Sequence, residues 1–145
     1  MLRIITLIII HCSAVMPHQQ SSALQIDLWH RQMGWSGIGY HYVIRRDGTV
    51  ELGRGESQVG AHCKGHNDHS IGICYEGGLD ARGQPSDTRT PAQKEKLLIL
   101  LKELKKRYPH ALITGHNTFN PAKACPCFDA AHEYLWLSDA KPGTF

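Results

Sequence analysis

The stretch that decides the fold is IITLIIIHCSA, residues 4–14. Five of the seven residues from Ile4 to Ile10 are isoleucine, and β-branched side chains favour a strand that is buried on both faces. A short export signal is the alternative, because a basic start precedes this run and small residues follow it. The run is at the lower end of the signal-peptide length range and is far shorter than the ~20 apolar residues that span a bilayer. We therefore predict a central strand that ends at His11, where α/β proteins commonly carry functional residues.

The composition is that of one ordinary globular domain. Hydrophobic residues make up 41% and charged residues 20% of the 145 residues, which is enough for a single core. The net charge of +3 is mild, and the basic residues are dispersed, so an anionic partner is favoured over nucleic acid. We expect one domain over residues 1–145, a monomer, and no membrane span.

Histidine and cysteine are the residues to explain. The chain has 10 histidines, which makes a metal site worth seeking, and 5 cysteines, which cannot all pair within one chain. Cys12 and Cys74 lie in apolar, strand-like contexts and are expected to be small buried hydrophobic residues. Without a convincing export signal, a reducing compartment is favoured over a disulfide framework. At least one cysteine therefore needs another role.

The remaining elements follow from periodicity and turn chemistry. Asp47 and Gly48 form the turn of a hairpin, and Thr90, Pro91 and Gln93 provide a capping box for a long helix. The predicted elements after the first strand are a helix over 23–33, hairpin strands over 40–45 and 49–52, a strand over 70–75, a helix from 91, a strand over 111–114 and a helix over 129–137. This order predicts a mixed α/β sheet covered by helices.

Two of these helices carry specific expectations about their faces. In the helix over 23–33, helical spacing places Leu24 and Leu28 on one face, which we expect to be buried. In the long helix, leucines form a buried stripe and lysines near the C-terminus form a solvated face that complements the helix dipole. These lysines are Lys102, Lys105 and Lys106.

Two predicted strands end on histidine, at His11 and His116, and the stretch NPAKACPCF follows the second one. A catalytic zinc ion takes imidazole nitrogen and thiolate sulfur from three protein ligands and leaves a fourth position for water. His11, His116 and either Cys125 or Cys127 would supply that set. Spacing alone leaves the alternative open, since a histidine at a strand end is often a hydrogen-bonded structural residue.

Several separated motifs carry a resemblance to a known family. They are IIIHCSA, GYHYVIRRDGTVE, VGAHCKGHNDHSIGICYEGG, TPAQ and KACPCFD, between about Ile4 and Trp136. In this order they resemble the zinc-dependent N-acetylmuramoyl-L-alanine amidases, the family of the amidase-type lysozyme of the T-odd coliphages and, more distantly, of the animal peptidoglycan recognition proteins. The resemblance implies an α/β domain in which helices flank a central mixed β-sheet with an open zinc cleft.

The resemblance also implies site residues. It assigns zinc ligation to His11, His116 and Cys125, and catalytic support to Tyr40 and Lys123. The neighbouring Cys127 is then a non-ligand, although it could substitute for Cys125. The loop NTFNPA departs from the coliphage form, which leaves the reach of Lys123 open. The sequence does not decide whether Tyr40 or Lys123 acts as the proton donor.

His62, in VGAHCKGH, is expected to line the substrate cleft, with anchoring of its own loop as the alternative. A metal-bound histidine also needs an outer hydrogen-bond partner to fix its tautomer, and the sequence does not identify one.

The implied activity is zinc-dependent hydrolysis of the amide between N-acetylmuramic acid and L-alanine in peptidoglycan. Zinc suits this chemistry because it activates water and polarises a carbonyl. Two alternatives remain: a peptidoglycan-binding module without catalysis, and a cysteine hydrolase that uses Cys12 or Cys63. We expect synthesis in the cytoplasm without a signal peptide and action on the wall after release, as for an endolysin.

Overall fold

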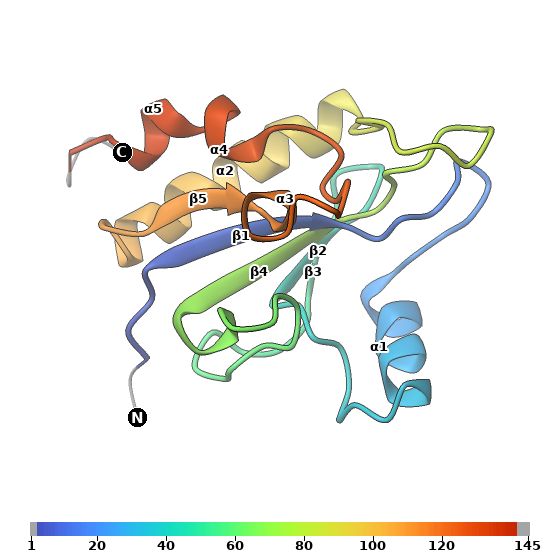
Figure 1. Cartoon of the computed structure of the whole chain (residues 1–145), viewed down its shortest axis with the longest axis horizontal. Helices are drawn as coiled ribbons and strands as arrows, with labels where there is room; N and C mark the ends of the chain where they lie inside the picture. Colours follow the sequence, from blue (N-terminus) through green and yellow to red (C-terminus); the bar gives the residue numbers. More distant parts are fainter. Residues whose placement is uncertain (1–2, 142–145) are drawn as a thin grey trace.

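A five-stranded mixed sheet forms the centre of the protein (Figure 1). The computed structural model describes residues 3–141. In the sheet order β3-β2-β4-β1-β5, β1 is parallel to β4 and β5, and β2 is parallel to β4 and antiparallel to β3. The strands are β1 (Leu7–Cys12), β2 (Tyr42–Ile44), β3 (Val50–Leu52), β4 (Ser70–Tyr75) and β5 (Leu112–Gly115). The opening apolar stretch is thus a strand in the interior of the sheet, as predicted, although it begins at Leu7 and includes His11.

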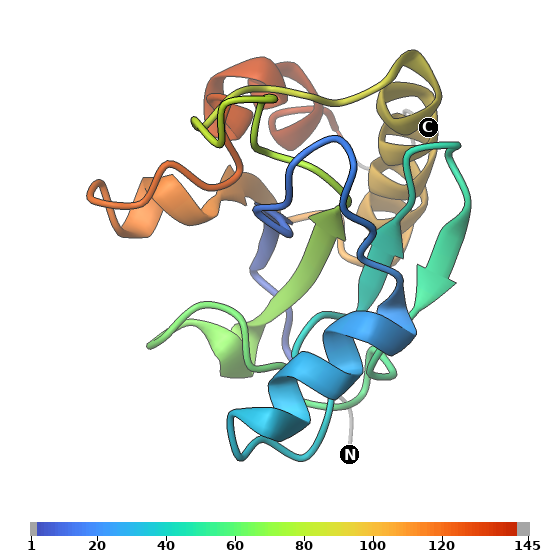
Figure 2. The same ribbon diagram turned by 90° about the vertical axis from the view of Figure 1, so that its right-hand side faces the viewer.

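Helices cover both faces of this sheet. Figure 2 shows α1 on one side of the sheet, and α2 with the C-terminal helices on the other. The helices are α1 (Ala23–Gln32), the 3₁₀ turn η1 (Asn67–His69), α2 (Pro91–Arg107), α3 (His116–Phe119), α4 (Ala130–Glu133) and α5 (Leu135–Ser138). The single helix predicted over 129–137 is therefore two short helices, which meet at Tyr134. Among residues 3–141, no helix combines the length and apolar content that crossing a membrane requires.

The alternation of side chains along β1 separates the core from the functional face. Ile8, Ile10 and Cys12 point into the main core beneath α2, α4 and α5. The opposite face carries a smaller apolar cluster, which joins α1 to the sheet. This cluster consists of Ile26, Ile38, Val43 and Cys74. Because His11 pairs with Cys74 across β1 and β4, its side chain lies on the α1 face.

The structure confirms the predicted start of α2, whereas the predicted solvent exposure of its lysines is wrong for Lys105. The side chains of Thr90 and Gln93 form the expected capping box. Lys105, however, is fully buried, and its Nζ donates to the carbonyls of Pro109 at 2.7 Å and Ala111 at 2.8 Å. The chain turns back over α2 after the helix ends, so its carbonyls replace water around this ammonium group.

The predicted buried face of α1 is also wrong. Leu24 and Leu28 are 70% and 47% exposed, whereas Ile26 on the other side of the helix is 2% exposed. The sheet offers only a small apolar cluster on this side, and polar contacts fix the orientation of α1. The backbone N–H of Ala23 donates to Glu51, and Asp27 accepts from the N–H of Ile38. A short helix held by such contacts buries the face that they select.

Candidate metal centre and cleft

His11 and His116 meet because of the register between β1 and β5. Ile10 pairs with Gly115 across these parallel strands, so the next residue of each chain segment lies at the same level of the sheet. Parallel neighbours also place both strand ends at one edge. The two imidazole rings are 4.8 Å apart between centroids. The pairing of two strand-end histidines expected from the sequence is therefore a consequence of sheet geometry.

Cys125 reaches these histidines because the segment after α3 folds back over the end of β1. The backbone N–H of Cys12 donates to Cys125 Sγ at 3.2 Å, and the N–H of Asn117 donates to the Cys125 carbonyl at 2.9 Å. Gly115 permits this close approach, since a Cβ there would lie 2.8 Å from Pro126 Cδ. The Tyr75 hydroxyl holds the same turn by donating to the Pro126 carbonyl at 2.6 Å.

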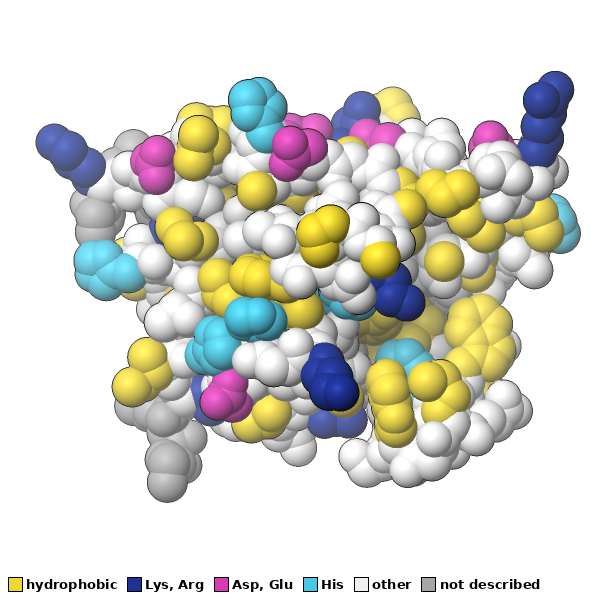
Figure 3. All heavy atoms as spheres, in the orientation of Figure 1, with side chains coloured by type: hydrophobic (Ala, Val, Ile, Leu, Met, Phe, Trp, Pro, Cys, Tyr) yellow, Lys and Arg dark blue, Asp and Glu magenta, His cyan; other side chains and the backbone are white. Residues whose placement is uncertain are grey.

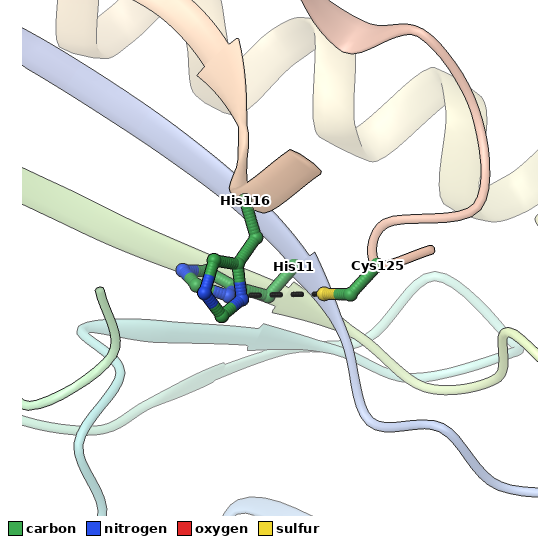
Figure 4. Close-up of side chains that lie close together, drawn as sticks. All are labelled: His11, His116 and Cys125. Carbon is green, nitrogen blue, oxygen red and sulfur yellow. Dashed lines mark hydrogen bonds between the residues drawn. The ribbon is translucent and has the colours of Figure 1, made fainter. Parts of the chain in front are cut away.

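These three side chains form a donor set suited to zinc (Figure 4). One ligand atom from each of His11, His116 and Cys125 lies within 4.8 Å of the others, and Cys125 Sγ is 3.8 Å from His11 Nδ1. Two imidazole nitrogens and one thiolate sulfur match a catalytic zinc site with an open fourth position. Within residues 3–141 this is the group of three such residues that could hold a metal ion.

Cys127 lies apart from this donor set. Its Sγ is 3.2 Å from the Gly78 carbonyl oxygen and 3.8 Å from Cys12 Sγ. The geometry therefore favours Cys125 over Cys127 as the sulfur donor.

The imidazoles of the site are held in their neutral form. Burial, with further contributions from His62 and His116, lowers the pKa of His11 well below its usual value. Burial also lowers the pKa of His116, and the charge of Lys123 adds to this effect. Burial and nearby positive groups lower the pKa of His62 to about 3. Neutral imidazole is the form that binds a metal.

A cleft of about 440 Å³ opens above the three donors and contains the predicted catalytic residues. Tyr40 lies beside His11, with 5.1 Å between ring centroids, and burial raises the pKa of its hydroxyl well above the usual value. Lys123 is exposed and also lines the cleft. In the space-filling view, histidine side chains lie in a hollow with hydrophobic and basic side chains around it (Figure 3).

His62 lines this cleft and makes a contact that the sequence did not reveal. Its Nδ1 lies 2.8 Å from Nε2 of His11, on the side of that ring away from Cys125. His30 and Trp35 also line the cleft without having been predicted as site residues. Trp35 lies outside the motifs that carry the family resemblance. His30 lies within a helix, where the sequence gives no indication that a residue faces a cleft.

The two cysteines considered as nucleophiles are in unsuitable surroundings. Cys12 and Cys63 are both buried. The hydrogen bond from Cys125 and burial raise the pKa of Cys12, and burial raises the pKa of Cys63. A nucleophilic cysteine needs a stabilised thiolate, so the structure disfavours a cysteine hydrolase.

Known phage endolysins and amidases are similar to this chain in sequence and in fold. The endolysin of Klebsiella phage KP32 is 48% identical and that of Escherichia phage T7 is 47% identical, each over 122 residues that cover 84% of this chain and 80% of the relative. The structure of the N-acetylmuramoyl-L-alanine amidase LysC from Clostridium intestinale URNW is similar, with a TM-score of 0.77 and 30% identity over 93% of this chain and 86% of LysC. A family model described as N-acetylmuramoyl-L-alanine amidase matches residues 1–128. The chain therefore belongs to the N-acetylmuramoyl-L-alanine amidase family and is a cell-wall hydrolase of that class.

Proposed function

We propose that this amidase depends on zinc held by His11, His116 and Cys125, and that its substrate is the amide between N-acetylmuramic acid and L-alanine in peptidoglycan. One observation carries the zinc proposal. Three donor atoms from β1, the start of α3 and the segment after it lie within 4.8 Å of one another. When bound, zinc lowers the pKa of a coordinated water to roughly 7 and polarises the scissile carbonyl.

The other proposed roles belong to the walls of the cleft. The Tyr40 ring lies beside the His11 ring in the cleft, which supports a role for its hydroxyl in orienting the attacking water or moving a proton. Lys123 lies two residues before Cys125 and lines the same cleft, so its ammonium group can stabilise the developing oxyanion. Which of the two residues donates the proton is decided by comparing the pH profiles of Tyr40→Phe and Lys123→Met.

We infer further that the protein works as a monomer on the bacterial cell wall after release from the cell interior. The name of its phage relatives, endolysin, supports action on the wall after release. Lysis assays on washed cells, with and without permeabilised membranes, test it. Lysis of intact cells from outside without permeabilisation would contradict a requirement for release.

The experiment that tests the zinc proposal compares zinc-loaded and EDTA-stripped protein on purified muropeptides. Mass spectrometry detects new free L-alanine amino termini. We expect release by the zinc-loaded form only, because the activated water is lost with the metal. Equal release by the stripped protein would reject zinc dependence. Tight binding without release by either form would instead identify a peptidoglycan-binding module.

A cysteine control completes this design. Cys63 is buried and is not a member of the three-donor set, so Cys63→Ser should retain release, whereas Cys125→Ser should lose it. If Cys63→Ser abolished release and left the fold intact, the cysteine-hydrolase reading would regain support.

A further inference from the structure

His62 stands between the metal ligand His11 and Ser70 in a buried hydrogen-bonded chain. Nδ1 of His62 lies 2.8 Å from Nε2 of His11, and Nε2 of His62 lies 3.1 Å from Ser70 Oγ. His62 is 9% exposed, and its two hydrogen-bond partners, His11 and Ser70, are more deeply buried. Both ring nitrogens of His62 are therefore engaged with protein groups, although the residue also lines the cleft.

Gly60 and Gly72 form a seat for this ring, because neither has a side chain to occupy the space. A Cβ at Gly72 would lie 2.6 Å from His62 Cδ2, and a Cβ at Gly60 would lie 2.7 Å from the same atom. Only glycine at these two positions leaves room for the imidazole. The backbone is held too, because Asn67 Oδ1 accepts from the N–H groups of His62 and Cys63 at 2.8 and 2.9 Å.

Arg3 fixes the two ends of the segment that carries His62. Its guanidinium group donates to the carbonyl of Gln58 at 2.9 Å on one side and to those of Asn67 at 2.7 Å and Ser70 at 2.9 Å on the other. These three bonds to one planar group restrain the loop at both of its ends. The position of the His62 ring is thus determined by the fold and not by a bound ligand.

The direction of each hydrogen bond follows from the ligand role proposed for His11. Nδ1 of His11 faces Cys125 Sγ, so this nitrogen must present its lone pair to a metal, and the proton must be on Nε2. His62 Nδ1 then has to accept from His11 Nε2–H. The remaining His62 proton is on Nε2 and is donated to Ser70 Oγ. The opposite tautomer of His62 would place a proton on both sides of the contact or force one onto the ligand nitrogen of His11.

We propose that His62 is a positioning residue of the metal centre, which accepts the Nε2–H of His11 and so holds the His11 ring with Nδ1 directed at the metal. This inference rests on the proposed zinc function. It supplies the outer partner that a metal-bound histidine requires, and removal of such a partner lowers metal affinity about 10–100-fold.

Two substitutions at this position test the proposal. His62→Leu fills the seat but offers no acceptor to His11. His62→Asn places its Oδ1 close to the former Nδ1 and retains an acceptor. His69→Asn is the matched control, since His69 belongs to the same loop and contacts His66 and Asp68 but none of the three donors. Circular dichroism and thermal melting of the metal-free proteins report whether each variant folds.

Zinc affinity is measured by competition with a chromophoric chelator, independently of catalysis. We expect His62→Leu to bind zinc about 10–100-fold more weakly, His62→Asn to recover most of this loss, and His69→Asn to bind as the wild type does. The absorption bands of the cobalt-substituted protein should shift in His62→Leu and return in His62→Asn. Wild-type affinity and cobalt bands in a folded His62→Leu variant would overturn the proposal.

A direct measurement of the tautomers is available even if His62→Leu does not fold. Long-range ¹H–¹⁵N correlation spectra of the zinc-loaded wild type should show His62 with an unprotonated Nδ1 and a protonated Nε2. A proton on His62 Nδ1 would refute the role assigned here. These results are separable from the zinc proposal, because a wild-type protein that releases L-alanine termini without metal would reject zinc dependence whatever His62 does.

Discussion

Gly72→Ala should weaken the proposed metal centre without altering any of its three proposed ligands. The added Cβ would lie 2.6–2.8 Å from the Cδ2, Cγ and Nδ1 atoms of His62, whereas ordinary carbon contacts are about 3.5–4.0 Å. The imidazole would therefore have to move by about 1 Å. A shift of that size breaks the 2.8 Å hydrogen bond to His11 unless the ring of His11 follows.

Two opposing effects set the magnitude of this change. Replacing glycine by alanine in a strand favours folding by about 0.4–1 kcal/mol, because the unfolded chain loses freedom. Overpacking a close-packed site costs about 1–3 kcal/mol. The ring cannot yield easily, since Gly60 lies against it from another side, so overpacking should dominate. We expect the melting temperature of the metal-free protein to fall by about 2–8 °C and zinc to bind about 10–100-fold more weakly.

Differential scanning calorimetry and chelator competition measure these two quantities. Gly55→Ala is the control, because its nearest neighbour, Gln58 Oε1, would lie 3.9 Å from the added Cβ and its backbone needs no special conformation. If Gly72→Ala melted at the wild-type temperature, the steric argument would be wrong. If it melted lower but bound zinc normally, the link between His62 and the metal would be wrong.

The remaining predictions concern the sulfur donor and a buried ion cluster. Cys125→Ser should lose zinc binding and activity, whereas Cys127→Ser should keep both, since Cys127 lies outside the donor set; equal loss in equilibrium dialysis would contradict this assignment. Arg89→Met should lower the free energy of unfolding by about 1–3 kcal/mol, less than for a fully buried pair because Glu133 is 43% exposed. Burial alone would raise the pKa of Asp87, but Arg89 holds it below its usual value, and hydrogen bonds from Arg89 lower that of Glu133. This stabilisation is present above pH ~4.5 and is lost as the pH falls through the lowered values, so urea unfolding should show wild type and Arg89→Met converging in acid; a constant difference would exclude the mechanism.

The sequence predicted the sheet because its strongest signals are local and are not overridden by packing. The isoleucine run of β1, the Asp47-Gly48 turn and the Thr90 capping box each depend on a few neighbouring residues. The faces of α1 and the burial of Lys105 were predicted wrongly, because they depend on which distant segment covers a helix. Periodicity shows that a helix has two faces but does not show which one the sheet will accept.

In the candidate site, too, local motifs could be recognised from the sequence, whereas contacts between distant segments could not. The proposed metal ligands were predicted through the resemblance of their motifs, and the register of β1 and β5 explains why two of them converge. The contact between His11 and His62 depends on where a long loop crosses β4, and nothing in VGAHCKGH encodes that crossing. Gly60 and Gly72 leave room for the His62 ring, but this role becomes apparent only when the structure shows which side chain faces them.

The donors of the metal centre are far apart in the chain, with 105 positions from His11 to His116 and the thiolate later still. The ribosome must therefore have synthesised most of the polypeptide before all three donors are available to bind an ion. Under the proposed function, metal binding is therefore a late step in the maturation of the protein. A truncated chain without Cys125 would lack the proposed sulfur donor and should therefore be inactive.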